Sequence, residues 1–435
     1  MGRRRLLVIT HTPGVEETID GGFRDIDPSP NVIAVTAGDT PPVGISHLGR
    51  TSPLRIRLRS PVVPDAVVIG SGPNGLVAAN LLADRGWSVE VLEAQPEPGG
   101  AVRSKELIEP GFTNDMFSAF YPLACASRVI GDLHLEDHGL RWCRSPLVLA
   151  NPTPDGRAAA LSMDLDETAG SLDGFAKGDG AAWRELFEKW ERLEDGLLGA
   201  LLTPFPPVRP LIKILSRLHP SELLPLARFG TLPVRRLGEE TFEGEGGRLL
   251  LAGNALHADF APESAISGFF GWLLTSVGQS MGYPVPQGGA NALTDALVAR
   301  LRSKGGIVTC SSPVTEIVVR GGRAVAVRTE SGEIDAARAV LADVNAPLLY
   351  GRLIAAEHLP ERVHDGIRRF QWDTSTIKVD WNLDGPIPWL ADEVRRAGTV
   401  HVVDSVDHLS DVSMQLATSQ IPARPFLLFG QYSMT

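Results

Sequence analysis

The chain has 435 residues, of which 43% are hydrophobic and 21% are charged, and its formal net charge is -11 at pH 7. A chain of this length can bury a large core and is expected to form roughly two or three domains. Because its charge is negative and no basic stripe offsets it, we expect no nucleic-acid partner. Length and composition together agree with a soluble enzyme.

The first 61 residues differ in composition from the rest of the chain. Residues 1–60 contain six prolines and seven glycines and show no sustained hydrophobic period. The apolar run Leu6–Ile9, which follows three arginines, is too short for a secretory signal. We therefore predict that residues 1–61 are a disordered extension or a misassigned start, and that the fold begins near Val62. The alternation over Leu54–Arg59 leaves two interpretations open, a short edge strand or a surface-binding arm.

The segment from Ala66 to Glu93 has the pattern of a nucleotide-binding unit. It predicts a strand over Ala66–Ile69, a glycine turn, a helix over Leu76–Asp84 and a second strand that ends at Glu93. Glycines in such a turn allow a tight bend and close approach of a pyrophosphate, which the helix N-terminus then binds. An acid at the end of the second strand accepts ribose hydroxyls and repels a 2′-phosphate. The segment predicts FAD or NAD rather than NADP, and an ordinary βαβ unit with glycines at its turn is the alternative.

A second glycine motif, Gly99-Gly100, favours FAD over NAD. It follows Glu93 after a few residues and is itself followed by Arg103 and Ser104. A chain with these residues can pass close beneath the pyrophosphate and ribityl part of an extended FAD, whereas nicotinamide dehydrogenases usually continue into another βαβ unit. Asp115 is predicted either to orient this loop or to cap a turn. The cofactor-binding residues expected from the two motifs are Gly70, Gly72, Pro73, Asn74, Gly75, Glu93, Ala94, Gly99, Gly100, Ala101, Arg103 and Ser104.

These motifs resemble the signature of the two-dinucleotide-binding-domain flavoproteins, which include amine oxidases, protoporphyrinogen oxidase and carotenoid desaturases. Three further runs, Pro110–Ser118, Tyr283–Leu293 and Val314–Arg328, are similar to the phytoene desaturase family. The resemblance implies an α/β fold in which a Rossmann-like FAD/NAD(P)-binding domain is interrupted by an α+β substrate domain. It also implies that Val314 places its backbone against the adenine and that Ala342 and Asp343 close the first lobe of the FAD site.

The same resemblance predicts how the chain divides. We expect residues 62–143 and 284–345 to form the FAD domain, and residues 144–283 and 346–435 to form the substrate domain. In the FAD domain we expect a helix from Asn291 to Lys304, a third parallel strand over Ile307–Thr309, a hairpin of Val314–Val319 with Ala324–Thr329, and a buried strand over Ala336–Ala342. In the substrate domain we expect a core stripe of Trp183, Phe187, Trp190, Leu193 and Leu197, a buried helix over Ala265–Val277, and a sheet strand over Thr376–Leu383.

The segment Leu201–Phe229 is broken by six prolines and mixes apolar with basic residues. Such a segment can lie in a membrane interface, which would suit a lipid-soluble substrate. A pair of helices packed on the protein is the other interpretation. Peripheral membrane contact is therefore one of two expectations for this segment.

The three cysteines, Cys125, Cys143 and Cys310, are far apart and form no CxxC pair. We therefore expect reduced thiols, a cytoplasmic protein (organellar if the source is eukaryotic), and neither a redox dithiol nor a metal site. His134 and His138 have a metal-like spacing, but Gly139 indicates that the helix ends there.

The resemblance implies an FAD-dependent oxidoreductase that oxidises a small apolar, polyene or lipid-like substrate by hydride transfer to the flavin. A second GxGxxG motif for NAD(P)H is missing, which favours oxygen, a quinone or another protein as electron acceptor. No catalytic side chain is predicted, because the flavin carries this chemistry. The family's glycine-rich C-terminal motif does not follow Thr376, so we expect a truncated chain that lacks the last part of its FAD site. Two alternatives stay open, a non-catalytic or regulatory relative and an NAD-dependent dehydrogenase.

Overall fold

The computed structural model describes residues 6–11, 63–203 and 206–435, with side chains from residue 63 onward. The chain forms two compact units, one of residues 1–100, 106–114 and 301–383, the other of residues 101–105, 115–300 and 384–435. This division differs from the expected domain ranges in its placement of residues 101–105, 115–143, 284–300 and 346–383. Residues 115–143 and 284–300 are joined inside the second unit, where the buried Arg300 side chain donates to the carbonyl of Leu133 at 2.7 Å.

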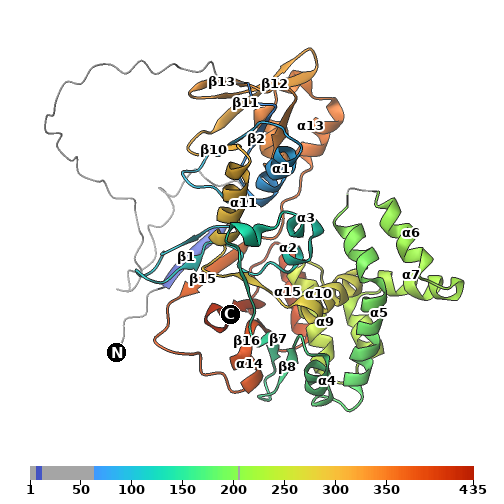
Figure 1. Cartoon of the computed structure of the whole chain (residues 1–435). Coiled ribbons are helices and arrows are strands. Elements are labelled where there is room, and N and C mark those ends of the chain that lie inside the picture. Colours follow the sequence, from blue (N-terminus) through green and yellow to red (C-terminus); the bar gives the residue numbers. More distant parts are fainter. Residues whose placement is uncertain (1–5, 12–62, 204–205) are drawn as a thin grey trace. The chain divides into compact units, whose positions relative to one another are not determined.

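The first unit is built on a four-stranded sheet in the order β10-β3-β2-β14. Two of its strands, β2 and β10, are labelled in Figure 1. Every neighbouring pair in this sheet is parallel. All four residues of β2 are buried, as expected for a strand covered on both faces of a parallel sheet. The sheet and its crossover helix are β2 (Ala66–Ile69), α1 (Pro73–Asp84), β3 (Val89–Leu92), β10 (Ile307–Thr309) and β14 (Ala339–Ala342). They confirm the expected Rossmann-like α/β fold.

The rest of the first unit surrounds this sheet. An antiparallel meander runs in the order β11-β12-β13, and the expected hairpin forms its first two strands. Leu353, which lies beyond the expected end of the FAD domain, is buried in the same apolar cluster as Val67 and Leu92. The elements here are β11 (Val314–Arg320), β12 (Arg323–Thr329), β13 (Gly332–Asp335), α12 (Ala346–Leu348), η3 (Leu349–Leu353), η4 (Ala356–His358), α13 (Glu361–Arg368) and β15 (Thr376–Trp381).

One expectation about β15 is wrong. We expected β15 in the sheet of the substrate domain, but it pairs antiparallel with β1 (Leu6–His11) in a separate two-stranded sheet. Residues 6–11 thus form a strand, and the expectation of a disordered extension or a misassigned start for the rest of residues 1–61 lies outside the described residues. The run Leu54–Arg59 lies outside the described residues. The pairing of residues 6–11 with a strand about 370 residues away could not be predicted, because hydrophobic periodicity reports only on neighbouring residues.

The second unit combines a mixed sheet in the order β17-β16-β7-β8 with a layer of helices. The expected core stripe on α5 (Asp179–Leu201) is confirmed, since Trp183 and Trp190 are buried together with Trp272 of α10 (Ser267–Met281).

The elements of the second unit are β4 (Ser104–Lys105), β5 (Asn114–Asp115), α2 (Pro122–Ala126), α3 (Arg128–Gly131), η1 (Leu135–His138), β6 (Trp142–Cys143), β7 (Leu147–Pro152), β8 (Ala158–Leu161), α4 (Leu165–Asp173), α5 (Asp179–Leu201), α6 (Val208–Ser216), η2 (Pro220–Glu222), α7 (Leu223–Thr231), α8 (Val234–Thr241), α9 (Glu245–His257), α10 (Ser267–Met281), β9 (Val285–Pro286), α11 (Asn291–Ser303), α14 (Asp392–Arg396), β16 (Ala397–Val402), α15 (Val406–Ala417), β17 (Leu427–Gly430) and η5 (Tyr432–Met434).

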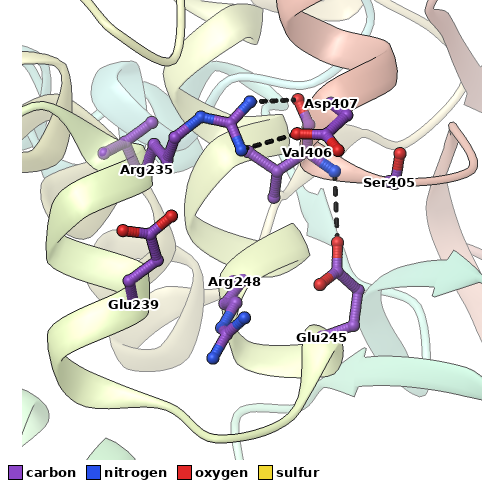
Figure 2. A pocket seen from close by; sticks show the side chains of 8 residues that line it. Arg235, Glu239, Glu245, Arg248, Ser405, Val406 and Asp407 are labelled. Carbon is purple, nitrogen blue, oxygen red and sulfur yellow. Dashed lines mark hydrogen bonds and ion pairs between the residues drawn. The ribbon is translucent and has the colours of Figure 1, made fainter.

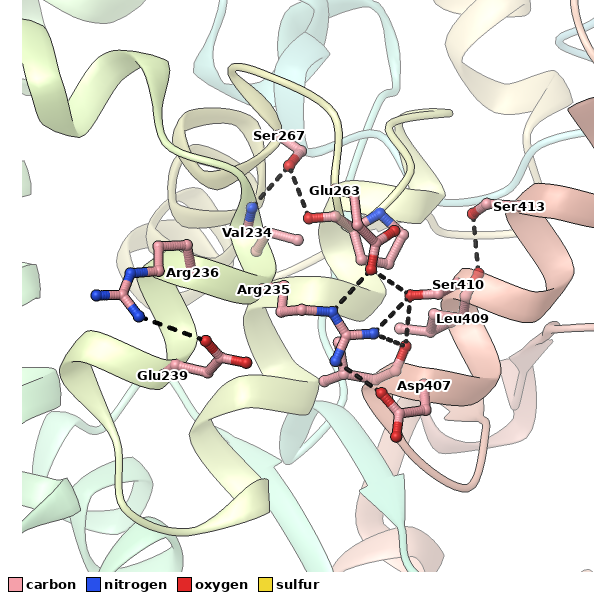
Figure 3. Close-up of polar contacts among 12 residues, drawn as sticks. Val234, Arg235, Arg236, Glu239, Glu263, Ser267, Asp407, Leu409, Ser410 and Ser413 are labelled. Carbon is pink, nitrogen blue, oxygen red and sulfur yellow. Dashed lines mark hydrogen bonds and ion pairs between the residues drawn. The ribbon is translucent and has the colours of Figure 1, made fainter.

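Arg235 ties α8 to α15 within the second unit (Figure 3). Its guanidinium donates to Glu263, Asp407 and Ser410, each at 2.7 Å. Because one guanidinium binds acceptors on different elements, it fixes the relative position of those elements. The helical layer is therefore held by a polar contact as well as by its apolar core.

Candidate functional site

The turn between β2 and α1 is too tight for a side chain at Gly70 and at Gly75. Gly70 has φ +93°, a backbone conformation that residues with a side chain rarely adopt. A Cβ on Gly75 would lie 2.4 Å from the carbonyl oxygen of Gly70. The turn is thus closed against side chains at two of its three glycines, while Pro73 occupies the first position of α1, where its missing N–H costs nothing.

The second glycine motif lies against the first one. The N–H of Gly99 donates to the carbonyl of Ser71 at 3.0 Å, and a Cβ on Gly100 would lie 3.1 Å from the Cα of Gly72. Two stretches of bare backbone therefore meet at the N-terminus of α1. A diphosphate needs such an approach to backbone N–H groups, so the residues present fit the cofactor that the motifs predict.

Glu93 is held in place by the turn that it faces. The side chain is 7% exposed. Its Oε2 accepts bonds from the N–H of Ser71 at 2.9 Å and from the hydroxyl of Ser71 at 2.5 Å, and its Oε1 accepts from the N–H of Gln95 at 2.9 Å. A carboxylate has about four acceptor positions, so three bonds leave capacity for a ribose hydroxyl. The expected role of Glu93 is consistent with this geometry.

Asp343 contacts the glycine turn directly. Its Oδ2 accepts a bond from the N–H of Gly75 at 2.8 Å, and its own N–H donates to the carbonyl of Ile69 at 2.8 Å. Burial raises the pKa of the Asp343 carboxyl; the Gly75 N–H opposes this, and the negative charge of Glu93 adds to it. One N-terminal donor of α1 is thus satisfied by the protein itself. The sequence indicated that Asp343 belongs to the site but gave no sign of its bond to Gly75.

The edge of the sheet beyond Glu93 is formed by the segment after β10. The carbonyl of Thr309 accepts from the N–H of Glu93 at 2.9 Å, and the N–H of Ser312 donates to the carbonyl of Glu93 at 2.8 Å. Val314 follows two residues later and packs on the apolar cluster of the sheet. Ala94 is exposed at this edge. The contact of Val314 with an adenine stays a prediction.

Three expected residues, Ala101, Arg103 and Ser104, lie in the second unit. There the Ser104 hydroxyl donates to Asp115 at 2.6 Å and accepts from the N–H of Asn291 at 3.0 Å, while Asp115 accepts from the N–H of Ala290 at 2.7 Å. Ser104 and Asp115 therefore cap the start of α11, which is the turn-capping alternative for Asp115. The Arg103 guanidinium lies over the ring of Phe117, 5.9 Å from its centroid. Cofactor contacts of Ala101, Arg103 and Ser104 stay predictions.

A cavity of about 240 Å³ in the second unit is lined by charged residues of α8, α9 and α15 (Figure 2). Glu245 accepts from the N–H of Val406 at 3.1 Å, and Arg248 donates to the carbonyl of Phe242 at 2.7 Å. Together with the Arg235 contacts, these bonds show that the charged side chains around the cavity hold neighbouring helices together. The cavity therefore has a structural explanation.

The three thiols are free, and burial raises the pKa of Cys310. A raised pKa lowers the fraction of the reactive thiolate. Among residues 63–203 and 206–435, no group of three or more His, Cys, Asp or Glu side chains is arranged to hold a metal ion.

Comparison with known proteins identifies the family. The model of the family described as flavin containing amine oxidoreductase matches residues 74–420. Mouse pyridine nucleotide-disulfide oxidoreductase domain-containing protein 2 is 27% identical over 356 residues, which cover 74% of this chain and 60% of the relative.

Two carotenoid enzymes are similar as well. Prolycopene isomerase 1 of an Oncidium hybrid is 26% identical over 68% of this chain and 51% of its own length. The zeta-carotene-forming phytoene desaturase of Myxococcus xanthus is 26% identical over 66% of this chain and 54% of its own length. The chain spans less than two thirds of the length of these relatives. The expected resemblance to phytoene desaturases is confirmed. The chain belongs to the flavin containing amine oxidoreductase family, and its cofactor is FAD.

Proposed function

We propose that the protein is an FAD-dependent oxidoreductase that oxidises a small apolar, polyene or lipid-like substrate by hydride transfer, with oxygen, a quinone or another protein as electron acceptor. The observation that carries the proposal is the packing of Gly99-Gly100 against the glycine turn beside the buried Glu93. The names of the relatives support the substrate class, since they include a prolycopene isomerase, phytoene desaturases and a limonene dehydrogenase subunit.

The chain's own residues would bind and orient the cofactor. Bound FAD supplies the ring that accepts the hydride, so no protein nucleophile is needed. The N-terminus of α1 and the bare backbone of the two glycine motifs would hold the diphosphate, and Glu93 would hold the adenosine ribose. Asp343 keeps the turn in shape through its bond to Gly75.

The first test is the visible spectrum of the purified chain, read together with that of Glu93→Gln. The wild type should carry the bands of oxidised flavin. The Gln variant loses a charged acceptor, and hydrogen bonds to charged groups contribute roughly 1.5–3 kcal/mol. FAD affinity should therefore fall at least about tenfold. The matched control is Glu106→Gln, an exposed acid of the first unit, which should bind FAD as the wild type does.

The test also separates the alternatives. A wild-type chain that is colourless and refuses added FAD would support a non-catalytic or regulatory relative. Binding of NAD in place of FAD would support a nicotinamide-dependent dehydrogenase. A flavin-loaded chain would then be mixed with apolar polyenes, and bleaching of the flavin bands without air would identify a substrate.

We also propose that the protein meets its apolar substrate at a membrane surface, through α6. This helix packs on α5 with Ile214, which faces Gly196. The same helix exposes Val208, Leu211, Ile212 and Leu215, and Ile212 is 60% exposed. An amphipathic helix with its apolar side free can lie in a lipid interface.

The charges beside this stripe fit an anionic surface. Arg128, Lys213 and Arg217 all pair with Asp195, so three cations share one carboxylate. Lys213, which lies on α6 itself, would attract anionic lipid headgroups. No helix in the described part of the chain has the length and apolar character needed to cross a bilayer.

A further inference from the structure

An open groove of about 640 Å³ lies on the second unit, between α5, α7 and α8. Its volume is in the usual range for small-molecule sites, roughly 300–1,000 Å³. Six of its ten lining residues are apolar, namely Leu186, Leu224, Pro225, Phe229, Leu232 and Leu237. Neither the glycine motifs nor the polar cavity of Figure 2 contributes a residue to it.

Lys189 is the unusual residue of this groove. Its ammonium lies 4.5 Å from the centroid of the Phe229 ring. Burial lowers the pKa of Lys189; the positive charge of Arg192 adds to this, and Glu185 opposes it. Within residues 63–203 and 206–435, the ammonium has no carboxylate within ion-pair distance, although Glu185 lies one turn away on α5. A half-buried cation held only by an aromatic ring has lost water without gaining a full counter-charge.

The other two charges of the groove neutralise each other. Arg228 donates to both oxygens of Glu240, at 2.8 and 2.5 Å. Arg236 pairs with the same carboxylate at 2.7 Å. Arg236 also contacts Glu239 at 3.8 Å. The two arginines therefore face two carboxylates, and the charge left for a ligand is the positive charge of Lys189.

The mouth of the groove is apolar. Leu224 is 80% exposed at its rim, and the preceding Leu223 is 43% exposed. Covering an exposed leucine with a hydrocarbon chain is favourable because it removes apolar surface from water. An occupant that combines a hydrocarbon chain with one negative charge would match both features.

We propose that this groove binds a single-chain amphiphile with a carboxylate head, such as a fatty acid. The carboxylate pairs with the Lys189 ammonium, and the chain covers Phe229 and Leu224. The site is additional to the flavin site and does not depend on the proposed oxidation.

The test is isothermal titration of the full chain with dodecanoate and with dodecanol, both below their aggregation concentrations. The wild type should bind dodecanoate at least about tenfold more tightly than the alcohol, because only the acid can pair with Lys189. Lys189→Met keeps an apolar stem without the charge and should remove this preference, whereas Lys189→Arg should keep it. Lys177→Met, at an exposed position of the same unit, should behave as the wild type does.

Three outcomes would overturn the proposal. One is a wild-type chain that binds neither ligand. Another is equal affinity for the acid and the alcohol. The third is an acid preference that Lys189→Met retains. The thermal unfolding midpoint of each variant verifies that it is folded, and the Arg variant separates loss of charge from loss of packing.

Discussion

The carboxylate of Asp343, at the end of β14, accepts the backbone N–H of Gly75 in the first turn of α1 at 2.8 Å. A negative charge at a helix N-terminus is stabilising in itself. The same carboxylate is half-buried near Glu93, and burial raises its pKa. The hydrogen bond to Gly75 is therefore favourable, whereas the negative charge of the half-buried carboxylate is unfavourable. A substitution that keeps the bond and removes the charge can separate these two contributions.

We predict that Asp343→Asn stabilises the protein at neutral pH and that this gain disappears in acid. Asn keeps an oxygen for the Gly75 N–H but carries no charge. Because the folded pKa of Asp343 lies above its ordinary value of 3.8, its ionisation removes stability as the pH rises through the folded pKa. Urea unfolding at pH 7 and below pH 3.8 should show a positive difference only at the higher pH. A loss of stability at pH 7 would mean that the charge at the helix terminus dominates.

Gly75→Ala should destabilise the first unit and abolish flavin binding. The added Cβ would lie 2.4 Å from the Gly70 carbonyl oxygen, and forcing atoms into such a space costs roughly 1–3 kcal/mol. Gly366→Ala is the matched control, because a Cβ there meets nothing within 4 Å and the position is helical. Thermal unfolding and flavin content measure both effects. Equal behaviour of the two variants would contradict the close approach in the turn.

His401 should make the protein sensitive to acid. It is fully buried beside Asn151, and neither ring nitrogen finds a hydrogen-bond partner among the described residues. Burial holds the pKa of His401 well below its ordinary value of 6.5, and His257 adds to this. Stability should therefore fall as the pH drops from 6.5 toward the folded pKa, since the unfolded chain binds the proton first.

His401→Leu should weaken this dependence, because the leucine does not titrate. The measurement is the denaturant midpoint at pH 7 and at pH 5, with His358→Gln, at a more exposed position, as the control. An unchanged difference between the two pH values would show that another group causes the acid sensitivity.

The membrane proposal predicts that Ile212→Asp and Leu215→Asp each reduce binding to anionic vesicles about tenfold or more. Burying such a side chain contributes roughly 1.5–3 kcal/mol, which the charged residue forfeits. Ile421→Asp is the control, because Ile421 is 94% exposed and lies outside α6. Cosedimentation with vesicles of phosphatidylserine and phosphatidylcholine measures the effect. If the control loses as much binding as the α6 variants, the contact is not made by this stripe.

The sequence predicted those parts of the fold whose signal is local. The strand Ala66–Ile69 was predicted with its observed bounds, and the helix from Asn291 to within one residue of its observed end, because hydrophobic period and glycine placement decide both. The bond between Asp343 and Gly75 joins residues 268 positions apart, and no periodicity reports such a distance. The environment of Lys189 could not be predicted for the same reason, since its contact with the Phe229 ring forms only when α7 packs beside α5.

The order of strands in the parallel sheet affects how the chain matures. Ala66 pairs with Val89 on one side and with Ala339 on the other. A ribosome therefore releases both glycine motifs long before it has made the strand that completes their sheet. Long-range pairings of this kind form slowly and leave hydrophobic edges exposed meanwhile. During synthesis the nascent chain therefore carries both glycine motifs before Asp343 is present to accept the Gly75 N–H.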